Sequence, residues 1–381
     1  MFGLFEFLKD RQLHRERILA LDLLRGTFLI VIVTSHIAWN PSLFTFVGGG
    51  SKLPASAGEA FFVISGLLVG YLYAPKVLKE TKKVFKKIWK RAALLYFLAT
   101  FFTFFYTAWA VLEPQSHLTL YAREPWRFLV DTLTLRYAFG WAGYLNLYAL
   151  FMLVAPFAVW LVAKGKGLLV IAASVAIWFF LREELRLAPF AAWQLLFMCA
   201  LVIGYYLPQL EAWYRHLPKR LRLSLFGSIC GVAIITYLAS IVLFVAAPLV
   251  ATPDSPLLRL NAELGQYLDK THLAPARVAI GTVWFAALYM IFRRFERAIS
   301  RGTRGVLEVF GKQSLFVYCL HAFILFFIDL YFQPPLPNLI IQNTVVTFAV
   351  LALIYFAASY RARATKYGKR LLRNKNTTAV P

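Results

Sequence analysis

Apolar stretches of about 20 residues recur along the whole chain, and this recurrence is the feature that most restricts how it can fold. A helix needs about 20 mostly apolar residues to cross a lipid bilayer. Hydrophobic residues make up 60% of the chain, against roughly 45–50% in ordinary soluble domains. The sequence therefore predicts an all-α integral membrane protein with about ten transmembrane helices, the fifth being the shortest: residues 18–39, 55–73, 92–112, 144–162, 167–181, 189–207, 223–247, 276–292, 314–332 and 339–360.

Basic residues lie mainly between these segments, and most of them fall in alternate connections. The net charge of +23 would indicate a nucleic-acid ligand in a soluble protein, but Lys and Arg beside apolar segments mark the cytoplasmic side of a membrane protein. We therefore expect both termini in the cytoplasm and no nucleic-acid partner. The predicted organisation is a cytoplasmic N-terminal segment (residues 1–17), one polytopic membrane domain (18–360) and a basic cytoplasmic tail (361–381) that contacts anionic lipids.

The three cysteines give no sign of a metal centre. Cys199, Cys230 and Cys319 are widely spaced, lie within apolar runs and form no CxxC pair. We expect them to be small core residues and predict no metal site.

Two ionisable residues of the first predicted span share one helix face. Arg25 and His36 lie eleven positions apart, which on an α-helix is about 16 Å of rise and about 20° of rotation. Arg25 would lie near the cytoplasmic side and His36 near the outer side. One helix could thus carry a cation that binds an anionic donor substrate and a histidine that accepts a proton. The alternative is that Arg25 pairs with Asp22 and that His36 is an ordinary interfacial histidine.

Two further ionisable residues could join them. Glu59 enters the second span from its outer end and should lie near the depth of His36, where its carboxylate could accept a ring N–H and raise the basicity of the other nitrogen. Its simpler role is to cap the helix or to pair with Lys52. We expect His321 at the depth of Arg25. There it could contact the pantetheine arm of a coenzyme A donor, or it could have only a structural role.

Cationic residues gather before the third span, in residues 76–91. The lysines there recur at three- and four-residue spacing and form one stripe. Lys90 and Arg91, next to the span, could bind the phosphates of coenzyme A, and the stripe could equally bind anionic lipid headgroups. On the outer side, the long connections 113–143 and 248–275 include Arg136, which could contact a polar substrate or belong to an ordinary solvated loop.

Several motifs resemble those of a known family, the acyltransferase-3 superfamily of membrane acyltransferases. They are residues 21–26 (LDLLRG) followed by His36, residues 59–66 (EAFFVISG), and residues 311–315 (GKQSL) followed by Tyr318 and His321. Residues 133–137 (LTLRY), 147–148 with Pro156, and 192–197 (AWQLLF) are more similar to the OpgC-type branch, whose members succinylate osmoregulated periplasmic glucans. The similarity covers most of residues 17–330.

The resemblance implies a bacterial inner-membrane enzyme with about ten helices around a central site. It implies a cytoplasmic acyl-CoA donor, succinyl-CoA or acetyl-CoA, that acts as substrate and is not permanently bound, and an external glycan hydroxyl as acceptor. It assigns His36 as the base and Arg25 either to donor binding or to organising the site, and the OpgC-like strings suggest substrate contacts at Arg136, Tyr148, Trp193 and Gln194. Superfamily members often carry an arginine-rich stretch before the third helix, where this chain has mostly lysines.

The predicted reaction is O-acylation, in which His36, oriented by Glu59, deprotonates a glycan hydroxyl that attacks the thioester. Arg25, Asp22, His321, Lys90 and Arg91 would hold the donor. A covalent acyl-histidine intermediate is an alternative route. The alternative function is a transporter or flippase for a glycan or lipid-linked glycan, because intramembrane charges also mark transport paths. Binding of acyl-CoA separates the two, and the inverted repeats of many transporters are not evident in this sequence.

Overall fold

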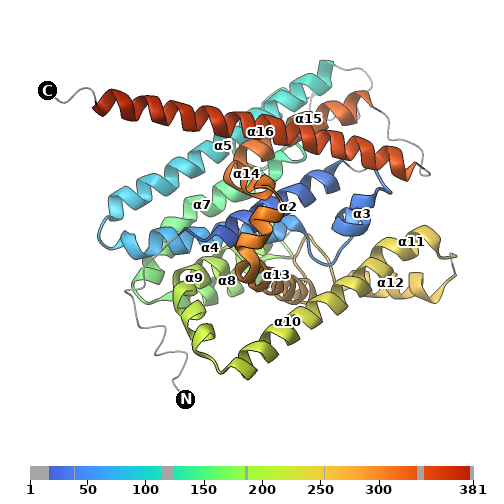
Figure 1. Cartoon of the computed structure of the whole chain (residues 1–381). Helices are drawn as coiled ribbons and strands as arrows, with labels where there is room; N and C mark the ends of the chain where they lie inside the picture. Colours follow the sequence, from blue (N-terminus) through green and yellow to red (C-terminus); the bar gives the residue numbers. More distant parts are fainter. Residues whose placement is uncertain are drawn as a thin grey trace. The chain divides into compact units, whose positions relative to one another are not determined.

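The computed structural model describes residues 17–37, 39–112, 124–184, 188–252, 254–332 and 339–377, with side chains up to residue 365. Within these ranges the chain is helical and has no strand (Figure 1). Apart from Arg17, the predicted N-terminal segment lies outside the described residues, as do the last residues of the predicted tail and residues 113–123 of the first long outer connection. The cytoplasmic location of both termini stays a prediction.

Nine helices in the described ranges are long and apolar enough to cross a membrane, so the prediction of an all-α integral membrane protein is confirmed. A tenth, α8 (Gly167–Leu181), is apolar but has only 15 residues, as expected for the shortest predicted span. The long helices are α2 (Leu19–His36), α4 (Ala57–Val77), α5 (Thr81–Leu112), α7 (Ala142–Ala163), α9 (Ala188–His216), α10 (Lys219–Ser240, continued by a π-helical stretch, η3, Ile241–Ala246, and by α11, Ala247–Val250), α13 (Pro275–Gly302), α15 (Ser314–Tyr331) and α16 (Ile340–Thr377).

Short helices occupy several of the connections between the predicted spans. They are α3 (Leu43–Gly48) with the 3-10 turn η1 (Gly49–Ser51), α6 (Pro125–Leu133), α12 (Pro256–Gln266) and α14 (Val306–Lys312). None is long enough to cross a bilayer, since a helix rises only about 1.5 Å per residue. A search for 20-residue apolar runs therefore could not detect them.

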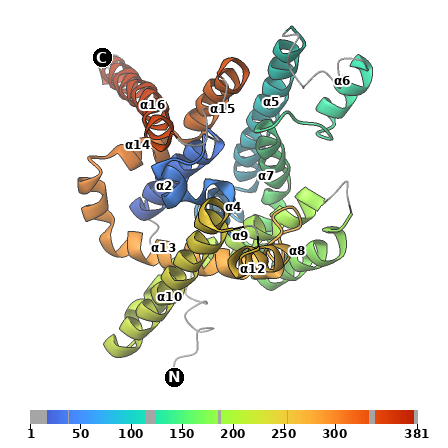
Figure 2. The same cartoon turned by 90° about the vertical axis from the view of Figure 1, so that its right-hand side faces the viewer.

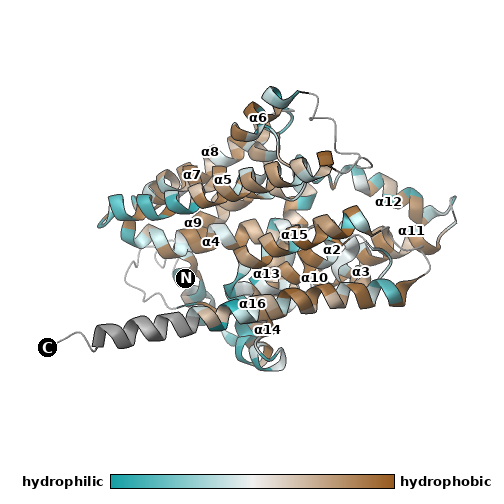
Figure 3. Cartoon of the chain, turned by 90° about the horizontal axis from the view of Figure 1, so that it is seen from above, coloured by the Kyte–Doolittle hydropathy of each residue, from teal (hydrophilic) through white to brown (hydrophobic). Residues whose placement is uncertain are grey.

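Two predicted spans are parts of longer helices. Helix α5 begins at Thr81, so the cationic stripe is helical from Lys82 onward and continues directly into the third span, whereas Lys79 lies in the turn between α4 and α5. Figure 3 shows the first turns of α5 in hydrophilic colours and the later turns in hydrophobic colours. Helix α16 likewise continues past the predicted end of the last span at Tyr360, through to Thr377.

The chain forms two compact units that are interleaved along the sequence. In the described ranges the first unit contains residues 59–225 and 267–278, and the second contains residues 17–58, 226–266 and 279–377. In the first unit, α4 and α9 approach closely through glycines: a Cβ at Gly70 would lie 1.8 Å from the carbonyl oxygen of Leu201, and one at Gly204 would lie 2.1 Å from that of Leu67. Small residues at such contacts let helix backbones meet in lipid.

In the second unit, the short helix α14 packs against the first half of α2 (Figure 2). The contact is reciprocal: a Cβ at Gly26 would lie 2.0 Å from the carbonyl oxygen of Leu307, and one at Gly311 would lie 1.9 Å from that of Asp22. Both glycines belong to the motifs that carried the family resemblance. Their lack of a side chain is what allows these two segments to touch.

Substituting Gly26 with alanine should therefore destabilise the second unit. The new methyl group would overlap backbone, which cannot move away as a side-chain end could, so we expect a loss of roughly 1–3 kcal/mol in the free energy of unfolding. Denaturant titration in detergent measures it. Gly227, in the middle of α10, is the matched control, because a Cβ added there would have nothing within 4 Å and Gly227→Ala should stabilise the helix by about 0.5–1 kcal/mol. Equal effects at the two glycines would contradict the close contact.

Candidate functional site

Two histidines meet in the second unit. His36 ends α2, and His321 lies on α15, two turns after Ser314. Nδ1 of His36 is 3.1 Å from Nε2 of His321. The ring centroids are 5.4 Å apart and the ring planes differ by 23°, and the distance between the two nitrogens lies within the range of a hydrogen bond. His321 is fully buried, and His36 is half-buried.

The contact corrects the expected depth of His321. The sequence placed it level with Arg25, but it lies beside His36 at the other end of α2. The physical reason is α14, whose Gly311 packs on the carbonyl of Asp22, so that α15 starts beside α2 and not below it. From Ser314, at the start of α15, seven residues carry the chain about 10 Å along the helix to His321. From Gly26, ten residues carry it about 15 Å along α2 to His36. Both histidines therefore lie well beyond the contact between α14 and α2.

Arg25 lies on the turn of α2 that contacts α14. It is half-buried, next to the close approach at Gly26. The described partner of Asp22 is Arg17, whose Nε donates to the carboxylate at 2.7 Å. This hydrogen bond raises the pKa of Arg17. The arrangement leaves Asp22 as an anchor for the start of α2.

The first turn of α14 carries a second polar anchor. Glu308 accepts hydrogen bonds from Lys312 and from the hydroxyl of Ser300, and these bonds lower the pKa of the Glu308 carboxyl. The carboxylate thereby joins α14 to the end of α13 while the reciprocal glycines join α14 to α2. Both attachments set the position from which α15 begins.

The segment that follows His36 is tied to two other helices. The side chain of Asn343 on α16 donates to the carbonyl of Pro41, and Thr344 Oγ1 accepts from the backbone N–H of Leu43. On the other side, the Tyr237 hydroxyl on α10 donates to the carbonyl of Val47 at 2.6 Å. These contacts hold α3 in place and thereby fix the end of α2 that carries His36.

In the first unit, Glu59 forms a buried ion pair with a residue that sequence reasoning had missed. Nε and one terminal nitrogen of Arg277 lie 2.7 and 2.6 Å from Glu59 Oε1. Glu59 is 6% exposed and Arg277 only 4%. Arg277 lies in the first turn of α13, directly after the second long outer connection. The predicted Glu59–His36 hydrogen bond joins residues of the two units and stays a prediction.

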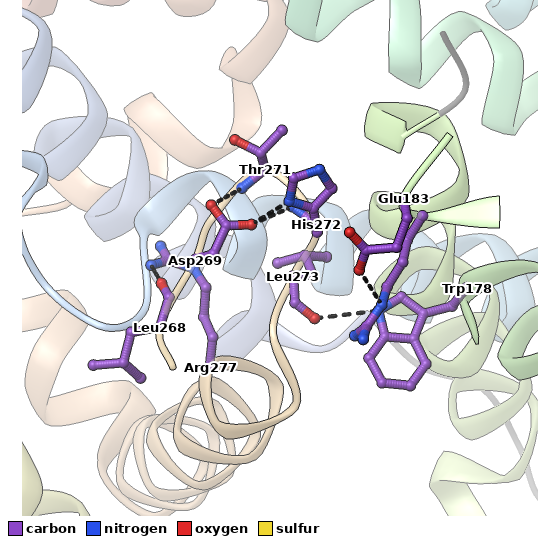
Figure 4. Close-up of polar contacts among 9 residues, drawn as sticks. Trp178, Glu183, Leu268, Asp269, Thr271, His272, Leu273 and Arg277 are labelled. Carbon is purple, nitrogen blue, oxygen red and sulfur yellow. Dashed lines mark hydrogen bonds and ion pairs between the residues drawn. The ribbon is translucent and has the colours of Figure 1, made fainter. Parts of the chain in front are cut away.

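The loop before α13 contacts Arg277, the arginine of this pair (Figure 4). Arg277 donates to the carbonyl of Leu268 at 3.1 Å. Asp269 accepts from the backbone and the ring of His272, each at 2.7 Å. Burial alone would raise the pKa of the Asp269 carboxyl, but its hydrogen bonds lower it. The indole of Trp178, on α8, donates to the carbonyl of Leu273 at 3.2 Å, so the loop bridges α8 and the start of α13.

The residues predicted to contact the acceptor fall into different environments. Tyr148 and Trp193 both pack on the ring of Phe62, with centroid distances of 6.1 and 5.6 Å. Gln194 is 2% exposed, and its amide bonds to the side chain and carbonyl of Ser174 and to the carbonyl of residue 191. Such saturation indicates a structural role in joining α8 to α9.

The charged residues predicted to bind phosphate or substrate lie nearer the surface. Lys90 is exposed and Arg91 is half-buried on α5. Arg136 is exposed just after α6, where its backbone N–H donates to the carbonyl of Asp131 at 2.8 Å. Their positions leave all three accessible to a ligand.

Sequence reasoning missed two partners in these contacts, Arg277 and the carbonyl of Tyr318. Arg277 lies 218 positions from its partner Glu59, and the carbonyl of Tyr318, which accepts from Nδ1 of His321, is backbone. Neither is visible as a spacing pattern. The one available signal was that Arg277 is a charged residue two positions after Pro275, at the start of an apolar run.

Comparison with known proteins gives one result. A family model described as OpgC protein matches residues 17–366. The matched region includes both histidine helices and the Glu59–Arg277 pair. No curated protein and no solved structure matches the chain.

Proposed function

Because the chain belongs to the OpgC protein family, and is thereby a multi-pass, glucan-modifying membrane acyltransferase, we propose that it transfers a succinyl group from coenzyme A to a glucan hydroxyl across the bacterial inner membrane. The observation that carries the proposal is the His36–His321 pair, which presents a half-buried imidazole at the end of a membrane helix. A histidine in such a place can accept the proton of an alcohol near neutral pH.

The proposed reaction needs no resident cofactor. A neutral nitrogen of His36 takes the proton of the glucan hydroxyl as its oxygen attacks the thioester carbonyl carbon. The new C–O bond forms, the C–S bond breaks, and the leaving thiolate of coenzyme A recovers the proton from the imidazolium. The products are the glucan ester and free coenzyme A, and His36 returns to its neutral state. In an alternative route, His36 itself attacks the thioester and then passes the acyl group on.

On the donor side we propose Arg25, Lys90 and Arg91. Lys90 is exposed and Arg91 half-buried on α5, and such side chains suit the phosphates of coenzyme A: an ammonium binds as a point charge, and a guanidinium as a two-pronged donor. Arg25, on α2, would contact the pantetheine arm or the thioester. His321 is no longer assigned to the donor, because it faces His36.

The experiment that tests this function uses the purified protein in liposomes. Succinyl-CoA or acetyl-CoA is supplied with a linear or cyclic glucan, and mass spectrometry of the glucan reports the group added. We expect transfer of succinyl in preference to acetyl. A preference for acetyl would overturn the succinyl assignment alone. Movement of unmodified glucan across the bilayer, with no acyl-CoA binding, would overturn the enzyme proposal in favour of a flippase.

A further inference from the structure

We propose that His321 is a positioning residue that holds His36 in the neutral tautomer whose Nε2 can accept a proton. The inference rests on the proposed function, because it assigns a task to His321 in the same reaction. It follows from three hydrogen-bonding groups in a row: a backbone carbonyl, the ring of His321 and the ring of His36.

The row begins with the carbonyl oxygen of Tyr318, one turn before His321 on α15. This oxygen can only accept a hydrogen bond, so Nδ1 of His321, which lies against it, carries the proton. In a neutral imidazole only one nitrogen carries hydrogen, and Nε2 of His321 is therefore left with a lone pair.

That lone pair decides the tautomer of His36. Nε2 of His321 faces Nδ1 of His36 at 3.1 Å, and two lone pairs at this distance would repel each other. Nδ1 of His36 must then donate its N–H to His321. The nitrogen left as proton acceptor on neutral His36 is Nε2, which makes Nε2 the base in the proposed reaction.

The same row stabilises the charged form of His36. When Nε2 takes the hydroxyl proton, Nδ1 keeps its own hydrogen and its bond to His321, which now runs from a cation to a neutral acceptor and is stronger. No group has to turn. Because His321 is fully buried, water does not compete for its lone pair. The carbonyl of Tyr318 cannot slip away either, since it belongs to the backbone of α15.

The packing around the pair is consistent with this task. The ring of Tyr318 stands edge-on to His321, with centroids 4.8 Å apart and planes at 64°. The reciprocal glycine contacts of α14 on α2 fix the height at which α15 begins. The orientation of the His321 ring and its position along α15 are thus both set by residues other than His36.

The test compares three substitutions on α15 in liposomes. His321→Leu removes the acceptor, and we expect kcat to fall roughly 10²-fold with KM for acyl-CoA little changed. His321→Gln places a carbonyl oxygen near the position of the lost Nε2, so it should recover activity to within about 10-fold of the natural enzyme. Phe323→Leu changes a 41% exposed residue of the same helix and controls for general disturbance.

A spectroscopic measurement distinguishes a tautomer effect from a merely structural one. In protein labelled with ¹⁵N-histidine, the signals that disappear in His36→Ala belong to His36. The natural protein should show a protonated Nδ1 and an unprotonated Nε2 on that ring at a pH where it is neutral. In His321→Leu the same ring should show a mixture of the two tautomers, while a structural role alone would leave the pattern unchanged.

The possible outcomes separate this inference from the proposed function. If His36→Ala keeps full activity, the base assignment fails and His321 loses its task with it. If His36→Ala is inactive but His321→Leu keeps the natural kcat, only the positioning role is refuted. A His321→Gln variant as impaired as His321→Leu, with the His36 tautomer unchanged in both, would refute it as well. The tautomer signals are read independently of activity, so poor folding of one variant does not leave the question undecided.

Discussion

Replacement of His36 with alanine should reduce acyl transfer by roughly 10²–10⁴-fold, the range over which a positioned general base accelerates a reaction. The substitution removes the imidazole that we propose takes the hydroxyl proton. It should not unfold the protein, because the ring is only half-buried. Initial rates in liposomes, with protein amount and secondary structure matched, measure the effect.

His216 provides the matched histidine control. It lies in the last turn of α9, in the other unit, and its Nδ1 contacts the carbonyl of Ala212 at 2.7 Å. His216→Gln should keep nearly full activity. Full activity in His36→Ala would remove the base from the mechanism. A labelled acyl group trapped on the natural protein, but absent from His36→Ala, would replace direct transfer with the acyl-histidine route.

The fold was predictable from sequence to the extent that lipid imposes it. A bilayer admits only helices or closed barrels and fixes their length, so α2, α4 and α7 were found within a few residues of their described bounds. The short helices α3 and α14 obey no such length rule. Their positions depend on tertiary contacts, such as the Asn343 side chain on the carbonyl of Pro41, which a single sequence does not display.

Individual residues of the candidate site could be predicted from the sequence, but the residues that contact them mostly could not. A charge inside an apolar run is costly and therefore conspicuous, which is why Arg25, His36 and Glu59 were singled out. Their partners were harder to predict. His321 was placed by counting turns from the expected membrane boundary, and that count failed because α14 brings the start of α15 alongside α2. The partner of Glu59 comes from a helix 218 positions away.

Loss of Arg277 should strongly destabilise the first unit. Arg277→Met would leave the Glu59 carboxylate buried without the guanidinium that holds it at 2.6 and 2.7 Å, and it would also remove the bond to the carbonyl of Leu268. Breaking a buried pair from one side costs about 3–5 kcal/mol. Denaturant unfolding in detergent, followed by tryptophan fluorescence, should show a loss of this size.

Arg127 is the matched control, because it also pairs with carboxylates, Glu124 and Asp131, but is 67% exposed. Arg127→Met should change stability by about 0–1 kcal/mol, since exposed pairs contribute little. The decisive variant is the double substitution Glu59→Gln with Arg277→Met. If the cost of Arg277→Met comes from stranding a buried charge, neutralising Glu59 should recover much of the lost stability. A double variant no more stable than Arg277→Met alone would mean that the arginine acts mainly by anchoring the loop at Leu268, and not by compensating Glu59.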